Sequence, residues 1–246
     1  MSVKFSDITS LKGLYDSDGD NTPIEFYLKI IPLSKEIKMN LGYFSSYAFS
    51  LLSYPMAKFI HNGGILKIIS NHNLNKDDIN NLIGINDNFN TDFIEPYFHN
   101  EDDIVKNLNH RSQHFFDCLK FLIHKKRLQI YPTRKIGGGD PHRKNMIFTN
   151  GEEKIAINGS LNFTLNGLAR NGENFNVDGS WDGVKSQEKI YELEKIFDQI
   201  FSGNHSKYEM LDKNKLIEII EKIGVNKTKD ELIVDSIKLD KRKKYL

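Results

Sequence analysis

The sequence predicts an α/β fold in which a mixed β-sheet is flanked by helices, with a helical tail at the C-terminal end. From residue 22 onward, apolar residues alternate between strand-like and helix-like spacing. A strand–helix–strand pattern over residues 36–69 favours parallel pairing, because parallel strands need a crossover connection. Three short apolar runs at hairpin-like separation after residue 144 favour antiparallel pairing.

The first half of the chain contains a lead-in and the crossover unit. Residues 1–21 predict a loose lead-in, because their acidic, Gly-containing end offers only turn chemistry. Ile37, Met39 and Leu41 alternate with polar residues, as in a strand, and Gly63 marks the end of the helix that follows. The expected elements are a helix over residues 22–32, a strand over 36–44, a helix over 47–60 and a strand over 65–69.

The second half of the chain contains a long helix, the hairpin strands and the tail. Residues 101–126 carry apolar side chains at helical spacing. Residues 207–246 alternate charged and apolar residues and end in a basic cluster, which indicates two helices and a basic end. We therefore divide the chain into the lead-in (1–21), a main domain (22–206) and a helical basic tail (207–246). The other expected elements are a helix over residues 76–83, strands over 128–131, 146–148, 154–157 and 175–177, and a helix over 181–201.

Composition bounds the possible functions. The chain has 246 residues, and its 34 Lys and Arg nearly balance 33 Asp and Glu, so no field of the whole molecule favours a polyanionic partner. The single cysteine, Cys118, can neither form an internal disulfide nor build a zinc site, and its apolar helical context predicts a core position. The N-terminus lacks the basic start and apolar run of an export signal, and no apolar stretch approaches the ~20 residues that span a bilayer. A cytoplasmic location and no membrane partner are expected.

Polar residues between positions 142 and 174 carry the clearest chemistry in the sequence. The pattern His-x-Lys occurs three times, but only His142 and Lys144 follow a Gly-rich loop and open an apolar strand. The next strand runs into Ser160, with Asn162 two residues beyond. Because adjacent antiparallel strands place the residue entering one beside the residue leaving the other, these side chains should converge. Imidazole, ammonium, hydroxyl and amide groups around one point suit a phosphoryl group, whose developing charge needs fixed donors.

Glu173 supplies the third element of this set. It precedes the strand expected over residues 175–177, and a carboxylate there is suited to orient a nucleophilic imidazole through its second nitrogen. A polar hairpin exposed to water is the alternative interpretation. His124 and His205, which begin the other two His-x-Lys patterns, are expected at the surface.

The sequence resembles the signature of the phospholipase D superfamily, most closely its single-motif bacterial nuclease branch, at His142, Lys144, Ser160, Asn162 and Glu173. The resemblance implies a mixed sheet between helices, and catalysis without a metal or other cofactor. It also implies that His142 attacks phosphorus to form a phosphohistidine. Lys144 and Asn162 would bind the non-bridging oxygens, and Ser160 and Glu173 would support these groups.

Two departures from the family pattern bear on activity and assembly. Family members often carry a structural Asp five residues after the motif Lys, where this chain has Thr149. They also supply a proton donor for the leaving oxygen from a second motif, and this chain has one motif only. The resemblance therefore implies a homodimer in which two chains share one active site. In the nuclease branch the domain is often joined to an ATP-driven helicase, so a helicase or another defence protein is an expected partner.

The sequence leaves three functions open. We expect a phosphodiesterase of the restriction or defence type that cleaves nucleic acid, with DNA as the favoured substrate. A phospholipid hydrolase or transferase shares the active site but usually carries two motifs and an apolar entrance. A non-catalytic nucleic-acid-binding module is the third possibility, and intact His142 and Lys144 argue against it. The basic residues expected to contact a phosphate backbone are Arg111, Arg127, Arg134, Lys135, Arg143 and Arg170.

Overall fold

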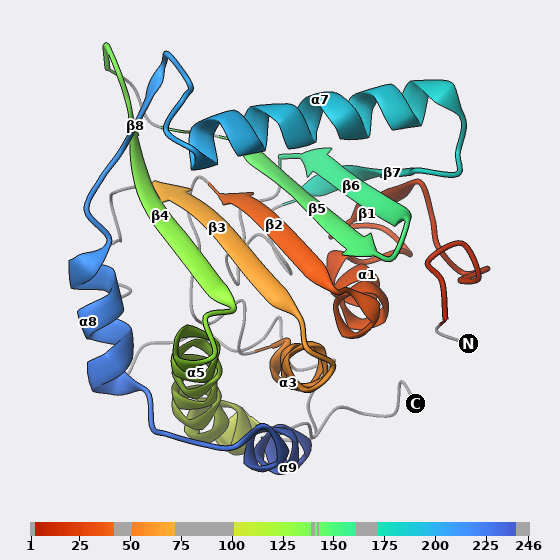
Figure 1. Ribbon diagram of the computed structural model, residues 1–246. Coiled ribbons are helices and arrows are strands. Elements are labelled where there is room, and N and C mark those ends of the chain that lie inside the picture. Colours follow the sequence, from red (N-terminus) through yellow and green to blue (C-terminus); the bar gives the residue numbers. More distant parts are fainter. Residues whose placement is uncertain are drawn as a thin grey trace.

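The computed structural model describes residues 3–41, 51–71, 101–138, 141, 143–160 and 172–239. The helix expected over residues 76–83 and the basic end of the chain lie outside these residues. Within them the predicted fold class is confirmed, because a mixed sheet carries helices on both faces (Figure 1). None of the described helices combines the length and the apolar composition that crossing a bilayer requires.

Eight strands form one sheet in the order β1–β7–β6–β5–β2–β3–β4–β8. β2, β3 and β4 are parallel to one another, and all other neighbours are antiparallel. The predicted parallel crossover unit and the predicted hairpins are therefore both present. The strands are β1 (Leu14–Asp16), β2 (Glu36–Leu41), β3 (Ile65–Asn71), β4 (Leu128–Lys135), β5 (Lys144–Asn150), β6 (Glu153–Gly159), β7 (Asn174–Gly179) and β8 (Tyr208–Met210).

The helices cover both faces of the sheet. They are α1 (Pro23–Ile30), followed by the 3-10 turn η1 (Ile31–Leu33), α3 (Ser53–His61), α5 (Glu101–His124), α7 (Val184–Phe201), α8 (Asn214–Ile223) and α9 (Lys229–Leu239). Ile37 and Met39 of β2 join the main core with Phe59 of α3, whereas Lys38 between them pairs with Glu194 of α7. This alternation places α7 on one face and α1, α3 and α5 on the other.

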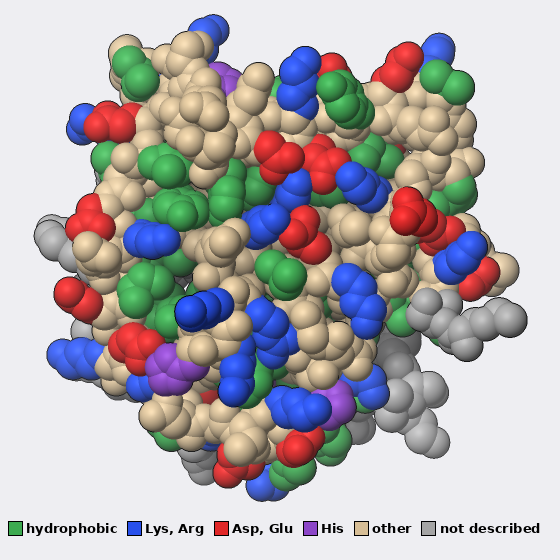
Figure 2. All heavy atoms as spheres, in the orientation of Figure 1, with side chains coloured by type: hydrophobic (Ala, Val, Ile, Leu, Met, Phe, Trp, Pro, Cys, Tyr) green, Lys and Arg blue, Asp and Glu red, His purple; other side chains and the backbone are tan. Residues whose placement is uncertain are grey.

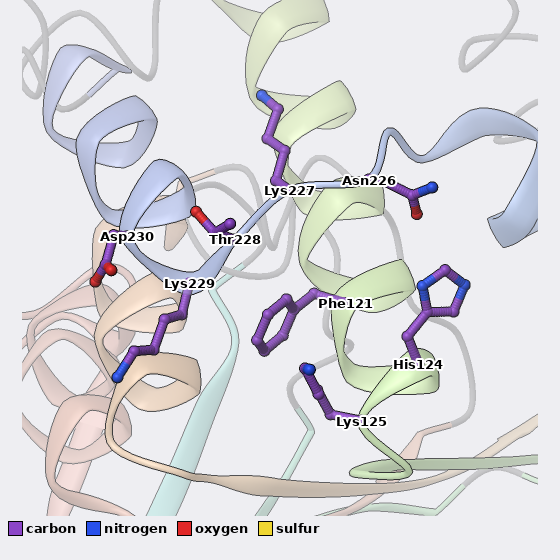
Figure 3. Close-up of a pocket in the computed structure, with 8 residues that line it drawn as sticks. All are labelled: Phe121, His124, Lys125, Asn226, Lys227, Thr228, Lys229 and Asp230. Carbon is purple, nitrogen blue, oxygen red and sulfur yellow. The ribbon is translucent and has the colours of Figure 1, made fainter.

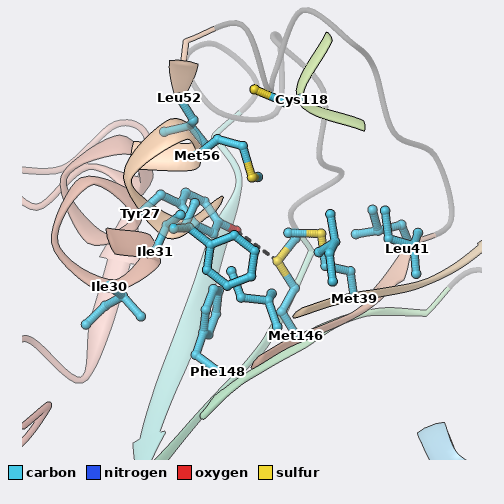
Figure 4. Close-up of a cluster of buried hydrophobic side chains, with 14 of the residues drawn as sticks. Tyr27, Ile30, Ile31, Met39, Leu41, Leu52, Met56, Cys118, Met146 and Phe148 are labelled. Atoms are coloured by element: carbon cyan, nitrogen blue, oxygen red, sulfur yellow. Dashed lines mark hydrogen bonds between the residues drawn. The ribbon is translucent and has the colours of Figure 1, made fainter. Parts of the chain in front are cut away.

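The main core lies between the sheet and α1, α3 and α5. Tyr27 of α1 is fully buried, and its hydroxyl contacts the Met146 sulfur at 3.8 Å (Figure 4). Phe26 packs edge-on against Phe175, with 5.2 Å between ring centroids. Cys118 is buried in the same core, as the sequence predicts, and burial raises the pKa of its thiol. The cysteine is therefore a core residue that does not ionise near neutral pH.

The N-terminal segment belongs to the core, which corrects the expected loose lead-in. β1 pairs with β7 at the edge of the sheet, and Phe5 and Tyr15 are 0% and 1% exposed. Tyr15 stacks on Phe175, with 5.6 Å between ring centroids. Burial here rests on a few isolated aromatic residues, so the turn-rich sequence around them shows no apolar periodicity.

The C-terminal region contains the two expected helices, α8 and α9, and a strand that the sequence does not predict. β8 pairs with β4 at the other edge of the sheet. Leu216 and Ile220 of α8 and Leu232 of α9 are buried in the main core. The region beyond residue 206 thus shares both the sheet and the core, and its division into a separate unit stays a prediction.

Candidate active site

The strand ends that carry the motif residues meet at one edge of the sheet. β5 begins beside the C-terminal ends of β2 and β6, and β7 begins beside the same end of β6. The parallel strands β3 and β4 also end at this edge. Lys144, Ser160 and Glu173 therefore lie along one edge, although 29 residues separate the first from the last in the sequence. We call this edge the motif edge.

Gly159 allows β6 and β7 to approach closely at the motif edge. A Cβ atom at this position would lie 2.1 Å from the Asn174 carbonyl oxygen and 2.6 Å from the Phe175 Cα, so only glycine fits. Ser160 follows, and its Oγ accepts a hydrogen bond from the Asn174 N–H at 3.2 Å. Its own N–H donates to the Asn174 carbonyl oxygen at 3.0 Å. These two hydrogen bonds hold the end of β6 against the start of β7.

Glu173 is held by a residue that sequence reasoning did not select. The Glu173 N–H donates to the Ser17 hydroxyl at 3.0 Å, and the Ser17 N–H donates to the Glu173 carbonyl oxygen at 3.0 Å. Ser17 directly follows β1, so the N-terminal segment fixes the backbone of the candidate orienting residue. The sequence signal for this contact was weak: a serine in an acidic turn is typical of local backbone hydrogen bonding.

The remaining motif residues divide between described and undescribed parts of the chain. Lys144 opens β5 and is half-buried at the motif edge. His142 and Asn162 lie outside the described residues. Their convergence with Lys144, Ser160 and Glu173 therefore remains a prediction of the sequence motif.

Three of the basic residues that are predicted to contact a phosphate backbone lie at the motif edge, toward β4 and β8. Arg134 and Lys135 end β4, and Arg143 directly precedes β5. The Arg134 Nε lies 2.7 Å from a Glu209 carboxylate oxygen on β8. The Arg143 Nε donates to the Tyr208 hydroxyl at 3.3 Å. Arg143 and Lys135 form no ion pair within the described part of the chain.

Arg127 does not join these residues. It lies just before β4, at the opposite edge, where its guanidinium donates to the carbonyl oxygens of Ile60 and Gly64 at 3.0 and 3.4 Å. Burial lowers the pKa of this guanidinium. Arg127 therefore connects α5 and β4 to the turn after α3, away from the motif edge, and its contact with nucleic acid stays a prediction. Arg170 lies outside the described residues. Arg111 belongs to α5, but the structure does not describe its side chain.

Charge is mixed on the face of the molecule that lies toward the viewer in Figure 2. Figure 2 shows Lys and Arg side chains interspersed with Asp and Glu on one face of the molecule. Among the described residues, no three His, Cys, Asp or Glu side chains group as metal ligands would.

A cavity of about 450 Å³ lies away from the motif edge (Figure 3). Phe121 and Lys125 enter it from the end of α5, and Lys229 and Asp230 enter it from the first turn of α9. These elements adjoin the beginnings of β3 and β4, opposite the motif residues. Side-chain chemistry, and not this cavity, thus identifies the candidate active site.

Comparison with known proteins finds similarity in fold. The sequence matches no family model and has no significant match among curated proteins. Nuc from Salmonella typhimurium, a phospholipase D family member, superposes with a TM-score of 0.43 and 16% identity over 76% of this chain and 93% of that chain. NucT from Helicobacter pylori superposes with a TM-score of 0.42 and 13% identity over 76% of this chain and 90% of that chain.

A phosphatidylserine synthase has a similar fold over a longer part of this chain. The synthase, from Haemophilus influenzae Rd KW20, superposes with a TM-score of 0.46 and 13% identity. The match covers 92% of this chain and 46% of the synthase. At identities this low, the similarity assigns neither an activity nor a substrate to this chain.

Proposed function

We propose that this chain is a metal-independent phosphodiesterase that cleaves nucleic acid, with DNA as the expected substrate, through a phosphohistidine at His142. The observation that carries the proposal is the arrangement of Lys144, Ser160 and Glu173 along one edge of the sheet. Lys144, Ser160 and Glu173 stand at three strand ends along this edge, and His142 precedes Lys144 by two residues in the sequence, which supports the proposal.

His142 is the nucleophile in this proposal. One ring nitrogen attacks phosphorus, and the bond between phosphorus and the leaving oxygen breaks. Water then attacks the phosphohistidine, the phosphorus–nitrogen bond breaks, and the free imidazole returns. Glu173 accepts a hydrogen bond from the second ring nitrogen, which keeps the attacking nitrogen unprotonated and in orientation.

Lys144 and Asn162 hold the non-bridging oxygens, where fixed donors stabilise the charge that develops in the transition state. Ser160 acts in support, because its contact with Asn174 fixes the point from which the chain continues towards Asn162. Thr149, where the family often has Asp, pairs with Glu36 at the far end of β5. Its departure from the family pattern is therefore remote from the reacting groups.

A homodimer is part of the proposal. The leaving oxygen needs a proton as its bond to phosphorus breaks, and the chain has one motif only. A second copy related by a two-fold axis supplies the missing donor through its own His142. A restriction or defence role, with a helicase or another defence protein as partner, extends the proposal and rests on the sequence resemblance alone.

Cleavage assays in excess EDTA test the proposed function. Labelled single- and double-stranded DNA and RNA are incubated with the wild type, His142→Ala and Lys144→Ala. Lys125→Ala is the matched control, because Lys125 is an exposed cation at the opposite edge. Cutting by the wild type and the control, lost in both motif variants, is the expected result. Cutting by His142→Ala, or no cutting by a confirmed wild-type dimer, contradicts the proposal; hydrolysis of phospholipid vesicles instead would favour the lipid alternative.

A further inference from the structure

β8 brings the C-terminal region to the motif edge. The register pairs Tyr208, the first residue of β8, with Lys135, the last residue of β4. The Ile136 N–H extends this pairing by donating to the Lys207 carbonyl oxygen at 2.9 Å. His205, which the sequence suggests is a solvated surface residue, is half-buried beside this strand. The C-terminal region thus contributes side chains beside the candidate active site.

Arg143 connects this strand to the motif. β5 and β8 are separated by β2, β3 and β4, so the strand spacing places them ~19 Å apart. The side chains of Arg143 and Tyr208 together span much of this gap, because the Arg143 Nε donates to the Tyr208 hydroxyl at 3.3 Å. Its guanidinium carbon lies 5.9 Å from the Tyr208 ring centroid, and His205 packs edge-on against the same ring at 4.9 Å between centroids.

The surroundings of Arg143 are positively charged. Arg134 is neutralised by Glu209, but neither Arg143 nor Lys135 has an ion-pair partner among the described residues. The pKa of His205 is lowered by burial and further by the positive charges of Arg143 and Lys207. Arg143 uses one of its five N–H donors on Tyr208, which leaves the two terminal nitrogens available for an oxyanion.

We propose that Arg143 and Lys135 form a second phosphate-binding subsite, which holds a phosphate of the substrate strand next to the one that is cleaved. The inference rests on the proposed function and deepens it. Lys144 contacts the scissile phosphate, and Arg143, the residue before it, contacts the neighbouring one. A substrate that fills both subsites carries at least two phosphates along one chain, as a polynucleotide does and a lipid with a single phosphodiester does not.

Tyr208 is the positioning residue of this subsite. Its hydroxyl accepts the hydrogen bond from Arg143, and its side chain packs against the small cluster formed by Ile69, Phe197 and Ile200. A fixed guanidinium binds phosphate with less loss of side-chain entropy than a mobile one. Tyr208 therefore acts through Arg143, without a phosphate contact of its own.

The test compares substrates with one and with several phosphates. kcat and KM are measured for bis(p-nitrophenyl) phosphate and for a short single-stranded oligonucleotide with Arg143→Ala, Lys135→Ala, Tyr208→Phe and the control Lys125→Ala. We expect Arg143→Ala and Lys135→Ala to lose roughly tenfold more kcat/KM on the oligonucleotide than on the small substrate, chiefly through KM. The slope of log binding constant against log salt concentration should fall by about 1 in each variant.

A double variant tests whether Tyr208 acts through Arg143. Tyr208→Phe should raise KM for the oligonucleotide, and Tyr208→Phe in the Arg143→Ala background should add nothing, because Tyr208 acts through Arg143.

Equal losses on both substrates, or an unchanged salt slope, would overturn the subsite. Binding by His142→Ala variants, measured by fluorescence anisotropy, separates the two proposals. If the wild type cuts nothing and these salt slopes still fall, the subsite stands and the proposed function fails.

Discussion

The Ser160 hydroxyl accepts a hydrogen bond from the backbone N–H of Asn174, with 3.2 Å between Oγ and nitrogen. This contact joins the end of β6 to the start of β7, and so joins the second element of the motif to the third. Glu173 directly precedes Asn174 and is held from its other side by Ser17. Three chain segments therefore fix the backbone of the candidate orienting residue, and the geometry of the motif edge depends on contacts between distant parts of the sequence.

Replacing Ser160 should uncouple these segments. Ser160→Ala removes the acceptor of the Asn174 N–H, which should cost about 1 kcal/mol in the free energy of unfolding. It should also lower kcat by roughly tenfold, because small displacements of positioning groups are costly. Ser160→Thr keeps the hydroxyl and should retain most of the activity. Denaturant unfolding and steady-state kinetics measure both effects; wild-type kcat in Ser160→Ala would show that the contact positions nothing.

Gly159→Ala should disrupt the same junction more severely. The added Cβ would lie 2.1 Å from a backbone oxygen of β7, which cannot yield as a flexible side chain would. The strands must separate locally, at a cost of about 3 kcal/mol in the free energy of unfolding. Gly151→Ala is an informative comparison, because a Cβ there meets no atom within 4 Å and only the positive φ of 61° is unfavourable. A smaller loss at Gly159 than at Gly151 would contradict the close-approach argument.

The buried ion pairs beneath α7 should respond asymmetrically to mutation. Lys38 Nζ lies 2.8 Å from Glu194 and 2.9 Å from Asp198, and Lys154 also contacts Glu194. Burial alone lowers the pKa of Lys38, but its hydrogen bonds to the two carboxylates outweigh burial and raise it. Lys38→Met leaves Glu194 paired with Lys154, so it should cost less than about 1 kcal/mol.

Glu194→Gln leaves a buried cation with only Asp198, whose side chain is 57% exposed. This variant should cost about 2 to 3 kcal/mol in the free energy of unfolding. Thermal and urea unfolding of Lys38→Met, Glu194→Gln and the double variant measure the asymmetry. A Lys38→Met protein less stable than Glu194→Gln would contradict it.

His114 should make stability depend on pH. It is 2% exposed on α5, and burial lowers its pKa from 6.5 to about 4, although Asp117 and Asp235 partly oppose this. Between these values the unfolded chain binds more protons at this position than the folded chain, so stability should rise with pH from about 4 to 6.5. The total contribution is about 3 kcal/mol.

Urea unfolding across this pH range measures the contribution of His114. His114→Gln keeps a polar side chain of similar size without the titration, and its stability should vary less with pH. His124→Gln is the matched control, because His124 is exposed at the end of the same helix. Identical pH profiles for His114→Gln and the wild type would show that His114 does not carry the effect.

Elements with regular apolar spacing were predictable from the sequence, and contacts made by isolated residues were not. The helix expected over residues 101–126 is α5, and the three hairpin strands pair as expected. β1 and β8 have three residues each, too few for an alternating pattern to appear. Both are edge strands that form because distant segments already present β7 and β4 as partners.

The same distinction holds for the candidate site. The motif spacing predicted that Lys144 and Ser160 lie at neighbouring strand ends, because antiparallel register follows from local pattern, and the structure has them there. That their side chains converge with His142, Asn162 and Glu173 stays a prediction. Ser17 and Tyr208 were missed, because their roles depend on which segment joins each edge of the sheet. Arg127 precedes the first residue of β4 and so lies away from the motif edge, although the sequence groups it with the basic residues around the motif strands.

The central claim is that His142 becomes covalently bonded to phosphorus. A single turnover with an oligonucleotide labelled at the scissile phosphate, quenched in alkali, tests it directly, because phosphohistidine survives base and is lost in acid. We expect an alkali-stable, acid-labile label that maps to the His142 peptide, is absent from His142→Ala, and occupies at most one chain of each dimer. Product formation without such a label, or a label on another residue, would contradict it.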